Sequence, residues 1–339
     1  MSNLEHPYVQ HLIRLARKSR ARVAVPDAQF DIRVLEAAAI VHRENWLHVV
    51  LTGARADIAA LAKLHHIDLT GIEIIDPAER SDFSELCNEY GRLRAKENLS
   101  SAQIGQVLRD PAYFACMLHR HGEVAGICSG VYYSTADIAR PAIKILGLQP
   151  GVAKMTALAV VVFRHTPLGD NLVLACADGT VLPRPSSEEL ADIAILAADK
   201  ARVILPDMPR VAMLSFSTLG SAKHEEVDRV VRALELVRKR RPDICIDGEF
   251  QLDTALSPYV AAKKVKRPSE VAGCANVLIW PDLQTGNVAG KGMLMMGPGA
   301  LVGACFLGLN GVVNDHSRGA TVEEIVINLA FVGAQISSS

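Results

Sequence analysis

The chain has 339 residues, of which 36 are lysine or arginine and 37 are aspartate or glutamate. This near-neutral balance argues against a nucleic-acid-binding protein, which normally carries an excess of basic residues. Half of the residues are hydrophobic and 22% are charged, an ordinary globular composition that argues against extensive disorder. At roughly 150 residues per domain, the length predicts about two domains.

No stretch of the sequence predicts export or membrane insertion. The apolar runs stay short of the roughly 18 residues that a membrane-spanning helix needs. The first ten residues, MSNLEHPYVQ, lack the basic and apolar regions of a signal peptide. The seven cysteines are scattered, without CxxC or zinc-ligand spacing. We therefore expect a cytoplasmic protein with free, mostly buried cysteines and with neither a metal site nor a membrane segment.

Short strand-like runs alternate with amphipathic stretches along the chain. The first run covers 22–26, and apolar residues at helical spacing follow over 31–42. Such alternation predicts a largely parallel sheet with helices on its faces. The turn sequence GLQPG at 147–151 is the best candidate for a joint between domains. Further strands are expected at 46–51, 73–75, 211–216 and 276–281, and further helices at 54–65 and 225–240.

The glycine-rich segment 286–292 (GNVAGKG) can be compared with a phosphate-binding loop. It fails the Walker A pattern twice, because Thr285 stands where the first glycine is required and Gly292 follows Lys291 where serine or threonine is required. No G-x-G-x-x-G sequence follows an expected strand, so a Rossmann dinucleotide site has no support. We interpret most glycines between 286 and 311 as loop residues, where the backbone can turn sharply or approach a ligand.

The segment 215–224 (SFSTLGSAKH) directly follows an expected strand. Its Ser221 and Lys223 suit an anionic ligand, since open α/β sheets bind ligands at the carboxyl ends of their strands and helix starts attract phosphate. The same residues also fit a hydroxyl-stabilised turn and a helix cap. From the residues alone, both interpretations stay open.

The densest polar cluster is the segment 314–326 (NDHSRGATVEEIV). Asp315, Ser317 and Arg318 precede an expected helix, where the planar guanidinium suits a phosphate or a carbonyl oxyanion. Thr321 and Glu324 have the spacing of a capping box, in which the glutamate bonds back to the helix start. Glu324 is therefore either a catalytic carboxylate or a structural cap.

Seven motifs occur in order between about residue 22 and about residue 329: RVAVPDAQFDIRVLEAA, RDPAYFACML, STADIARPAIKILGLQPG, PRVAMLSFSTLGSAKH, DICIDGEFQLDTAL, ANVLIWPDLQTGN and NDHSRG. Together they resemble the phosphotransacetylase (phosphate acetyltransferase) family of the phosphate acetyl/butyryl transferase group. The resemblance implies two three-layer α/β domains with largely parallel sheets and an interdomain cleft, similar to the isocitrate-dehydrogenase-type fold. The first domain would comprise 1–151 and 307–339, the second 152–306, and the chain would form a homodimer.

The family resemblance also implies an activity in acetate metabolism. Acetyl-CoA and phosphate would interconvert with acetyl phosphate and CoA, by base-assisted attack of the CoA thiol on the acyl phosphate carbonyl. A CoA thioester and phosphate or an acyl phosphate are then the expected partners, with no cofactor, metal, membrane or nucleic acid. Two alternatives are a non-catalytic acyl-CoA-binding regulatory module and the same chemistry on propionyl or butyryl groups.

The resemblance implies functional roles for the residues of this chain that match the family's motifs. Ser317 and Arg318 fall in the Ser-Arg-Gly motif, and Arg140 matches the arginine of the STADIARPA segment. Glu324, seven residues after the serine, stands where the family usually has an aspartate base. These four residues are the predicted catalytic set. The predicted substrate-binding residues are Arg94, Ser134, Thr135, Ser221, Lys223, Asn287, Lys291 and Asp315.

The chain departs from the family pattern at several positions. Glu324 is longer than aspartate by one methylene, and His316 replaces an apolar residue before the serine. The run 290–296 (GKGMLMM) is rich in glycine and methionine where the family has a Tyr-Lys-Ile-Ala-Gln-Arg-Leu-like helix-forming sequence. Tyr132 and Tyr133 replace small residues before Ser134. We expect the changed 290–296 run to affect CoA contacts and acyl choice. We expect the two tyrosines to narrow or reshape the site, and the longer side chain of Glu324 to move its carboxylate.

Overall fold

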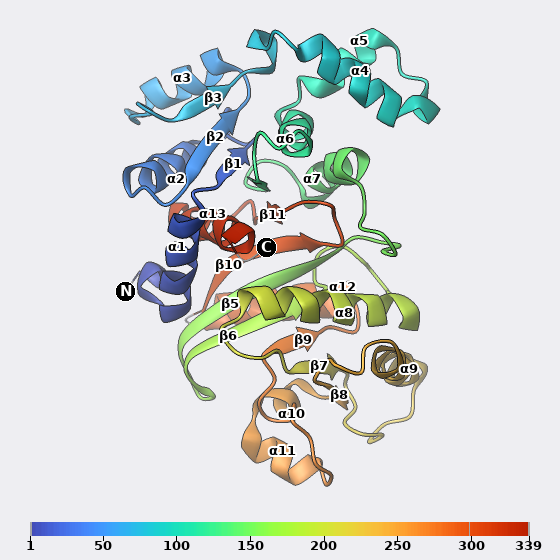
Figure 1. The fold of residues 1–339 in the computed structure, drawn as a ribbon. Helices are drawn as coiled ribbons and strands as arrows, with labels where there is room; N and C mark the ends of the chain where they lie inside the picture. Colours follow the sequence, from blue (N-terminus) through green and yellow to red (C-terminus); the bar gives the residue numbers. More distant parts are fainter. Residues whose placement is uncertain (1, 298, 338–339) are drawn as a thin grey trace. The chain divides into compact units, whose positions relative to one another are not determined.

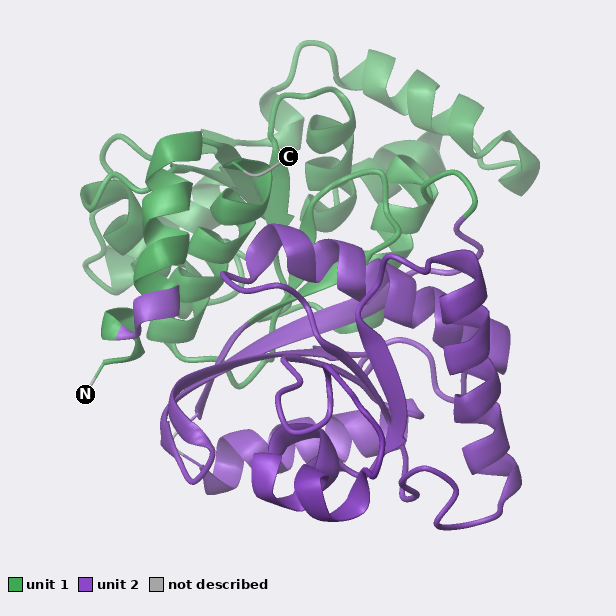
Figure 2. Ribbon diagram, turned by 60° about the horizontal axis from the view of Figure 1, so that its bottom comes forward, with its two compact units in different colours: residues 1–5, 9–151, 303–339 green, residues 6–8, 152–302 purple. Residues whose placement is uncertain are grey.

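The computed structural model describes residues 2–297 and 299–337 and separates into two compact units. Unit 1 comprises residues 1–5, 9–151 and 303–339, and unit 2 comprises residues 6–8 and 152–302 (Figure 2). Both units are α/β structures in which parallel strand pairing predominates. The predicted fold class, α/β with largely parallel sheets and helices on their faces, is confirmed.

The sheet of unit 1 has the strand order β3–β2–β1–β4–β11, and every neighbouring pair is parallel. The last residues of β10, from Gly303 onward, pair antiparallel with β11. Parallel neighbours place their carboxyl ends at the same edge, so the residues that follow β1, β4 and β11 meet there. These strands are β1 (Arg22–Val25), β2 (His48–Thr52), β3 (Glu73–Ile75), β4 (Gly126–Cys128), β10 (Gly299–Leu307) and β11 (Val313–Asp315).

Helices cover both faces of this sheet. Helices α2 and α13 pack against each other on one side, and α6 packs on β1, β2 and β4 from the other (Figure 1). Asp31 caps α2, since its side chain accepts a hydrogen bond from the Arg33 N–H. The helices are α1 (Pro7–Ser19, of which Pro7 and Tyr8 fall to unit 2), α2 (Ile32–Arg43), α3 (Arg55–Leu64), α4 (Phe83–Leu93), α5 (Ser101–Leu108), α6 (Pro111–Arg120), α7 (Thr135–Pro141) and α13 (Val322–Ser337), with short turns at Asn3–Glu5, Pro77–Glu79, Ala95–Glu97 and Ala142–Leu146.

In unit 2 the strand order is β5–β6–β9–β7–β8, with the first residues of β10 beside β5. The strands β5 and β6 form an antiparallel hairpin, while β6, β9, β7 and β8 are parallel neighbours. The carboxyl ends of the parallel strands again meet at one edge. The strands are β5 (Thr156–Thr166), β6 (Gly169–Ala177), β7 (Val211–Leu214), β8 (Ile246–Phe250) and β9 (Val277–Ile279).

Successive side chains of each strand point to opposite faces of this second sheet, and both faces are buried. Ala212 and Leu214 of β7 belong to a core cluster with Phe163 and Trp280, against which residues of α12 pack. Helices α8 and α9 pack on each other and on the sheet. The helices of unit 2 are α8 (Ser187–Ile204), α9 (Glu225–Arg240), α10 (Leu252–Leu256), α11 (Pro258–Lys264) and α12 (Leu283–Met296).

The structure confirms the expected strands and helices, with ends that differ from the expected ones by at most two residues. The loop interpretation of 286–292 is wrong, because this glycine-rich segment lies inside α12. A Cβ atom on Gly286 would lie 2.7 Å from the Trp280 ring and 2.9 Å from the Cα of Gly179. Close packing of the helix, rather than loop geometry, accounts for this glycine.

Two further features concern cysteines and membrane helices. The seven cysteines all lie in the described residues and form no disulfide with one another. Cys116, Cys128, Cys176 and Cys305 are buried, Cys87 and Cys245 are half-buried, and Cys274 is exposed. Within residues 2–297 and 299–337, no helix has the combination of length and apolar character that crossing a membrane requires.

Candidate active site

A buried carboxylate organises the carboxyl edge of the unit 1 sheet. Asp27, two residues after β1, accepts hydrogen bonds from the Ser129 hydroxyl at 2.6 Å and from the Tyr132 N–H at 2.8 Å. The Tyr133 N–H also points to it, at 3.3 Å. Burial raises the pKa of Asp27, and the hydrogen bonds from these donors offset only part of that rise. The segment after β4 is thus fixed by a residue that the sequence interpretation missed. The sequence feature that could have identified Asp27 is its position directly after the expected strand 22–26 of a parallel sheet.

Asp315, at the end of β11, is also buried. Its carboxylate accepts a hydrogen bond from the Thr135 hydroxyl at 2.6 Å, which joins two of the predicted substrate-binding residues. Gly130 has a φ of +111°, and a Cβ there would lie 2.2 Å from the Asp315 carboxylate. Glycine is therefore required where the two segments cross. Because Asp315 is buried and bonded, we interpret it as a residue that positions the segment rather than one that contacts substrate.

Burial raises the pKa of Asp315 to about 6, and the nearby Asp27 charge adds to this shift. A raised folded-state pKa means that the folded state binds the proton more tightly than the unfolded state, so this group's contribution to stability falls as pH rises through 6. A shift of two pKa units corresponds to about 3 kcal/mol.

We therefore expect Asp315→Asn to raise the free energy of unfolding by up to about 3 kcal/mol at pH 8. The gain should shrink as pH falls through 6 and disappear near pH 4, because the parent's Asp315 is then protonated and as neutral as the variant's asparagine. The asparagine amide oxygen still accepts the hydrogen bond from the Thr135 hydroxyl. Urea unfolding of variant and parent at both pH values measures this. Exposed Asp57 provides the control, because Asp57→Asn should change stability by less than about 0.5 kcal/mol at either pH. A gain at pH 8 that persists at pH 4 would contradict the assignment.

Ser317 and Arg318 lie exposed in the short segment between β11 and α13. The Ser317 N–H donates to Nδ1 of His316 at 2.9 Å. Burial lowers the pKa of His316, which keeps its ring neutral and Nδ1 able to accept. The Arg33 side chain donates to the carbonyl of Arg318 at 3.1 Å and is itself ion-paired with Asp31 at 2.6 Å. The backbone of the motif is therefore held from two sides.

The side chains of the motif remain available for a ligand. Within residues 2–297 and 299–337, the Arg318 guanidinium has no hydrogen-bond or ion-pair partner. The Ser317 hydroxyl accepts the Gly319 N–H at 3.3 Å and keeps its own proton for donation. An exposed guanidinium and a hydroxyl, both on a fixed backbone, suit an anionic group or a developing oxyanion.

Glu324 forms the capping box that its spacing predicts. Its carboxylate accepts the Thr321 N–H at 2.8 Å, and its own N–H donates to the Thr321 hydroxyl at 3.2 Å. The structural interpretation of Glu324 is thereby confirmed. The bonds to Thr321 use one carboxylate oxygen, Oε2, so the cap does not occupy the whole group.

Arg140 lies in the last turn of α7 with its side chain 57% exposed. The hydrogen bond from its guanidinium to the Asp137 carboxylate is long, at 3.4 Å, so the guanidinium is weakly held. Ser134 caps α7 by accepting the Asp137 N–H, and its hydroxyl donates to the Asp137 carboxylate at 2.6 Å. Ser134 therefore has a structural task, whereas Arg140 is available for a ligand.

Arg94 is more firmly paired. It forms an ion pair with Glu97, and Glu97 also binds Lys144 at 3.1 Å in the turn that follows α7. This chain of charges joins the end of α4 to the segment that carries Arg140. Because Glu97 neutralises part of its charge, Arg94 is less accessible to an anion than Arg318 or Arg140.

The other predicted substrate-binding residues belong to unit 2. Ser221 accepts the Thr218 N–H at 3.0 Å, and His224 caps α9, so the segment 215–224 forms the hydroxyl-stabilised turn and the helix cap that were one of its two interpretations. Lys223 is exposed. On α12, Lys291 is exposed and Asn287 donates to the Gly179 carbonyl at 3.3 Å.

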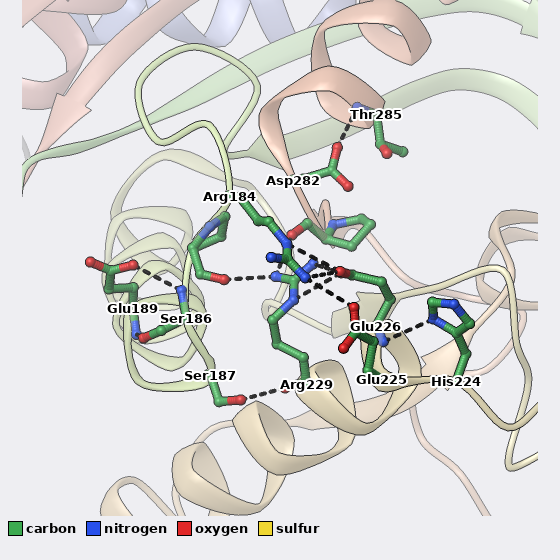
Figure 3. A network of polar contacts seen from close by, with 12 residues as sticks. Arg184, Ser186, Ser187, Glu189, His224, Glu225, Glu226, Arg229, Asp282 and Thr285 are labelled. Carbon is green, nitrogen blue, oxygen red and sulfur yellow. Dashed lines mark hydrogen bonds and ion pairs between the residues drawn. The ribbon is translucent and has the colours of Figure 1, made fainter.

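A polar network fixes the loops at the carboxyl edge of the unit 2 sheet (Figure 3). Arg229 of α9 donates to the carbonyls of Pro185 and Pro281, both at 2.8 Å. Glu226, one turn earlier, pairs with Arg229 and with Arg184. The starts of α8, α9 and α12 are thus tied together, which positions the segments carrying Lys223 and Asn287.

Comparisons with known proteins agree with this architecture. A family model described as phosphate acetyl/butaryl transferase matches residues 8–333. The phosphate acetyltransferase of Thermoanaerobacterium thermosaccharolyticum is 38% identical over 96% of this chain and 98% of its own length.

Solved structures give the same result. A phosphotransacetylase from Streptococcus pyogenes superimposes with a TM-score of 0.85 at 33% identity, over 97% of this chain and 98% of that one. A 4-hydroxythreonine-4-phosphate dehydrogenase from Burkholderia phymatum, at 13% identity and a TM-score of 0.56 over 94% of this chain and 99% of that one, shares the fold alone. The chain described here belongs to the phosphate acetyl/butaryl transferase family.

Proposed function

We propose that this protein is a phosphate acetyltransferase, which reversibly converts acetyl-CoA and phosphate into acetyl phosphate and CoA and so acts in acetate metabolism. Family membership over residues 8–333 supports the reaction class. The observation that carries the proposal is the exposed Ser317–Arg318–Gly319 segment, in which the Arg318 guanidinium is unpaired within the described ranges 2–297 and 299–337.

In the direction of acetyl-CoA synthesis, the CoA sulfur attacks the carbonyl carbon of acetyl phosphate. A carbon–sulfur bond forms, the bond from that carbon to the bridging oxygen breaks, and phosphate leaves with the electron pair. A free thiol has a pKa of about 8.5, so only a small fraction is thiolate at neutral pH. We assign Glu324 as the base that accepts the thiol proton through the carboxylate oxygen that the cap leaves free.

The two exposed arginines of unit 1 supply charge stabilisation. Arg318 would bind the carbonyl oxygen as it becomes an oxyanion, and Arg140 would hold the phosphoryl group. The Ser317 hydroxyl would donate to the reacting sulfur. Arg94, paired with Glu97, would contribute positive potential to phosphate binding rather than a direct contact.

The unit 2 residues are assigned to the remainder of CoA. Lys223 and Lys291 carry exposed ammonium groups that suit its phosphates, with Ser221 and Asn287 as polar neighbours on the same segments. We include in the proposal a homodimer, for which the family resemblance is the support, and light scattering of the purified protein measures it.

The direct test mixes purified protein with acetyl phosphate and CoA and follows the ultraviolet absorbance of the thioester. Formation of acetyl-CoA that depends on both substrates supports the proposal. Absence of thioester with acetyl, propionyl and butyryl phosphate, together with measurable acetyl-CoA binding by calorimetry, would overturn it in favour of a non-catalytic acyl-CoA-binding regulatory module.

Because the proposal assigns charge stabilisation to arginines, activity should withstand metal removal. Within the part of the chain that the structure describes, no three histidine, cysteine, aspartate or glutamate side chains gather as a metal site would require. We expect dialysis against EDTA to leave kcat unchanged. Loss of activity that added divalent metal restores would contradict this assignment.

A further inference from the structure

Two exposed aromatic side chains form a stack at the carboxyl edge of the unit 1 sheet. The rings of Phe30 and Tyr132 lie face to face, with centroids 4.0 Å apart and planes inclined by 12°. Phe30 is 37% exposed and Tyr132 is 52% exposed. Large apolar surfaces left in water at a sheet edge are typical of ligand-binding sites. None of the residues assigned so far uses this pair.

The stack is held rigidly from behind. Tyr133 packs edge-on against both rings, at 5.8 Å from Phe30 and 5.3 Å from Tyr132, and its own ring is buried. The Tyr133 hydroxyl donates to Asp110 at 3.3 Å. The N–H groups of Tyr132 and Tyr133 both donate to buried Asp27. A ring whose backbone and neighbours are fixed in this way presents a preformed wall rather than a mobile side chain.

Each ring is connected to the Ser317–Arg318–Gly319 segment through a few neighbouring residues and their hydrogen bonds. Phe30 is followed by Asp31, whose ion-pair partner Arg33 donates to the carbonyl of Arg318. On the other side, Tyr132 is followed within three residues by Thr135.

Thr135 donates to Asp315, which stands two residues before Ser317. The stack is therefore connected on both sides, through adjacent and hydrogen-bonded residues, to the segment to which the proposed function assigns the reacting carbonyl. CoA is an elongated molecule with its thioester at one end and its adenine at the other. A surface tied to the reacting segment by both routes is placed to meet the acyl end.

We infer that the Phe30–Tyr132 stack is a wall of the acyl pocket and restricts the enzyme to short acyl groups. This inference rests on the proposed function and identifies residues that determine its acyl specificity. A rigid wall excludes a longer chain because the rings cannot rotate aside without losing their stacking contact and the edge-on contacts with Tyr133. A pocket discriminates by roughly 10- to 200-fold for each methylene, so removing one ring should change the acyl preference measurably.

The experiment measures kcat/KM with acetyl, propionyl and butyryl phosphate at saturating CoA. For Phe30→Ala and Tyr132→Ala, we expect the butyryl-to-acetyl ratio to rise by about 10-fold or more over the parent. Tyr132→Phe keeps the ring and should keep the parent ratio. Tyr259, a 69% exposed tyrosine on α11, provides the matched control, and Tyr259→Ala should also keep the parent ratio.

The ratio separates a specificity role from structural damage, because damage to the fold lowers kcat/KM with all three donors equally. Phe30→Leu, a milder change, replaces Phe30→Ala if thermal unfolding shows that the alanine variant does not fold. An unchanged ratio in every ring-removing variant would overturn the inference. An unchanged butyryl-to-acetyl ratio together with a raised KM for CoA would also overturn it, and would indicate that the stack binds the adenine of CoA instead. If the parent itself forms no thioester, it is the proposed function that fails, and the parent measurement alone shows this.

Discussion

Replacing Arg318 with alanine is expected to lower kcat by a factor of about 10²–10³, the effect of removing one donor to a developing oxyanion. The guanidinium is exposed and, within the described ranges 2–297 and 299–337, has no protein partner, so it is free to bind the carbonyl oxygen. The substitution removes no contact that holds the segment, because Arg33 bonds to the backbone carbonyl of residue 318 and not to its side chain. The effect should therefore fall on catalysis and not on stability. Steady-state kinetics with acetyl phosphate and CoA, beside thermal unfolding, measure both.

Two further substitutions sharpen this test. Arg318→Lys keeps the charge but loses the planar fork, so it should recover only part of the lost activity. Arg43→Ala removes an arginine of α2 whose side chain is 70% exposed, and it should behave as the parent. Full activity in Arg318→Ala would exclude Arg318 from the reaction.

Replacing Glu324 with glutamine is expected to lower kcat by a factor of about 10²–10⁴ while leaving stability nearly unchanged. Glutamine cannot accept the thiol proton, but its amide oxygen can accept the Thr321 N–H, as glutamine does in natural capping boxes. The two roles of Glu324 are thereby separated in a single substitution.

A matched variant tests the cap alone. Thr321→Ala removes the hydroxyl that accepts the Glu324 N–H but keeps the carboxylate, so it should cost about 1 kcal/mol in stability. Its kcat should fall far less than that of Glu324→Gln. If Glu324→Gln is as active as the parent, Glu324 is a helix cap only, and another group must take the thiol proton.

The order and type of the elements could be predicted from the sequence because they depend on local patterns. Apolar residues at helical spacing predicted the helix at 225–240, and α9 spans Glu225–Arg240. The strand run 22–26 appears as β1 for the same reason. The capping box of Thr321 and Glu324 was also predictable, since its two residues are three positions apart.

Local patterns failed where packing overrides propensity. Glycines weaken an isolated helix, so the segment 286–292 did not favour one. In the folded chain, Gly286 allows α12 to approach Trp280 and Gly179 more closely than any side chain would permit. The tertiary contact therefore accounts for a glycine inside the helix, and no pattern within the segment contains that contact.

The candidate site also has features that the sequence predicts and features that only the tertiary structure shows. The motif Ser317–Arg318–Gly319 and its resemblance to a family are properties of adjacent residues, so the sequence alone identified them. The roles of Asp27 and Phe30 depend on parallel strands whose carboxyl ends meet although their residues are about a hundred positions or more apart. The sequence thus determined which residues are the candidates for the chemistry. Only the tertiary structure decided which buried groups hold them in place, because those contacts form between segments that are distant along the chain.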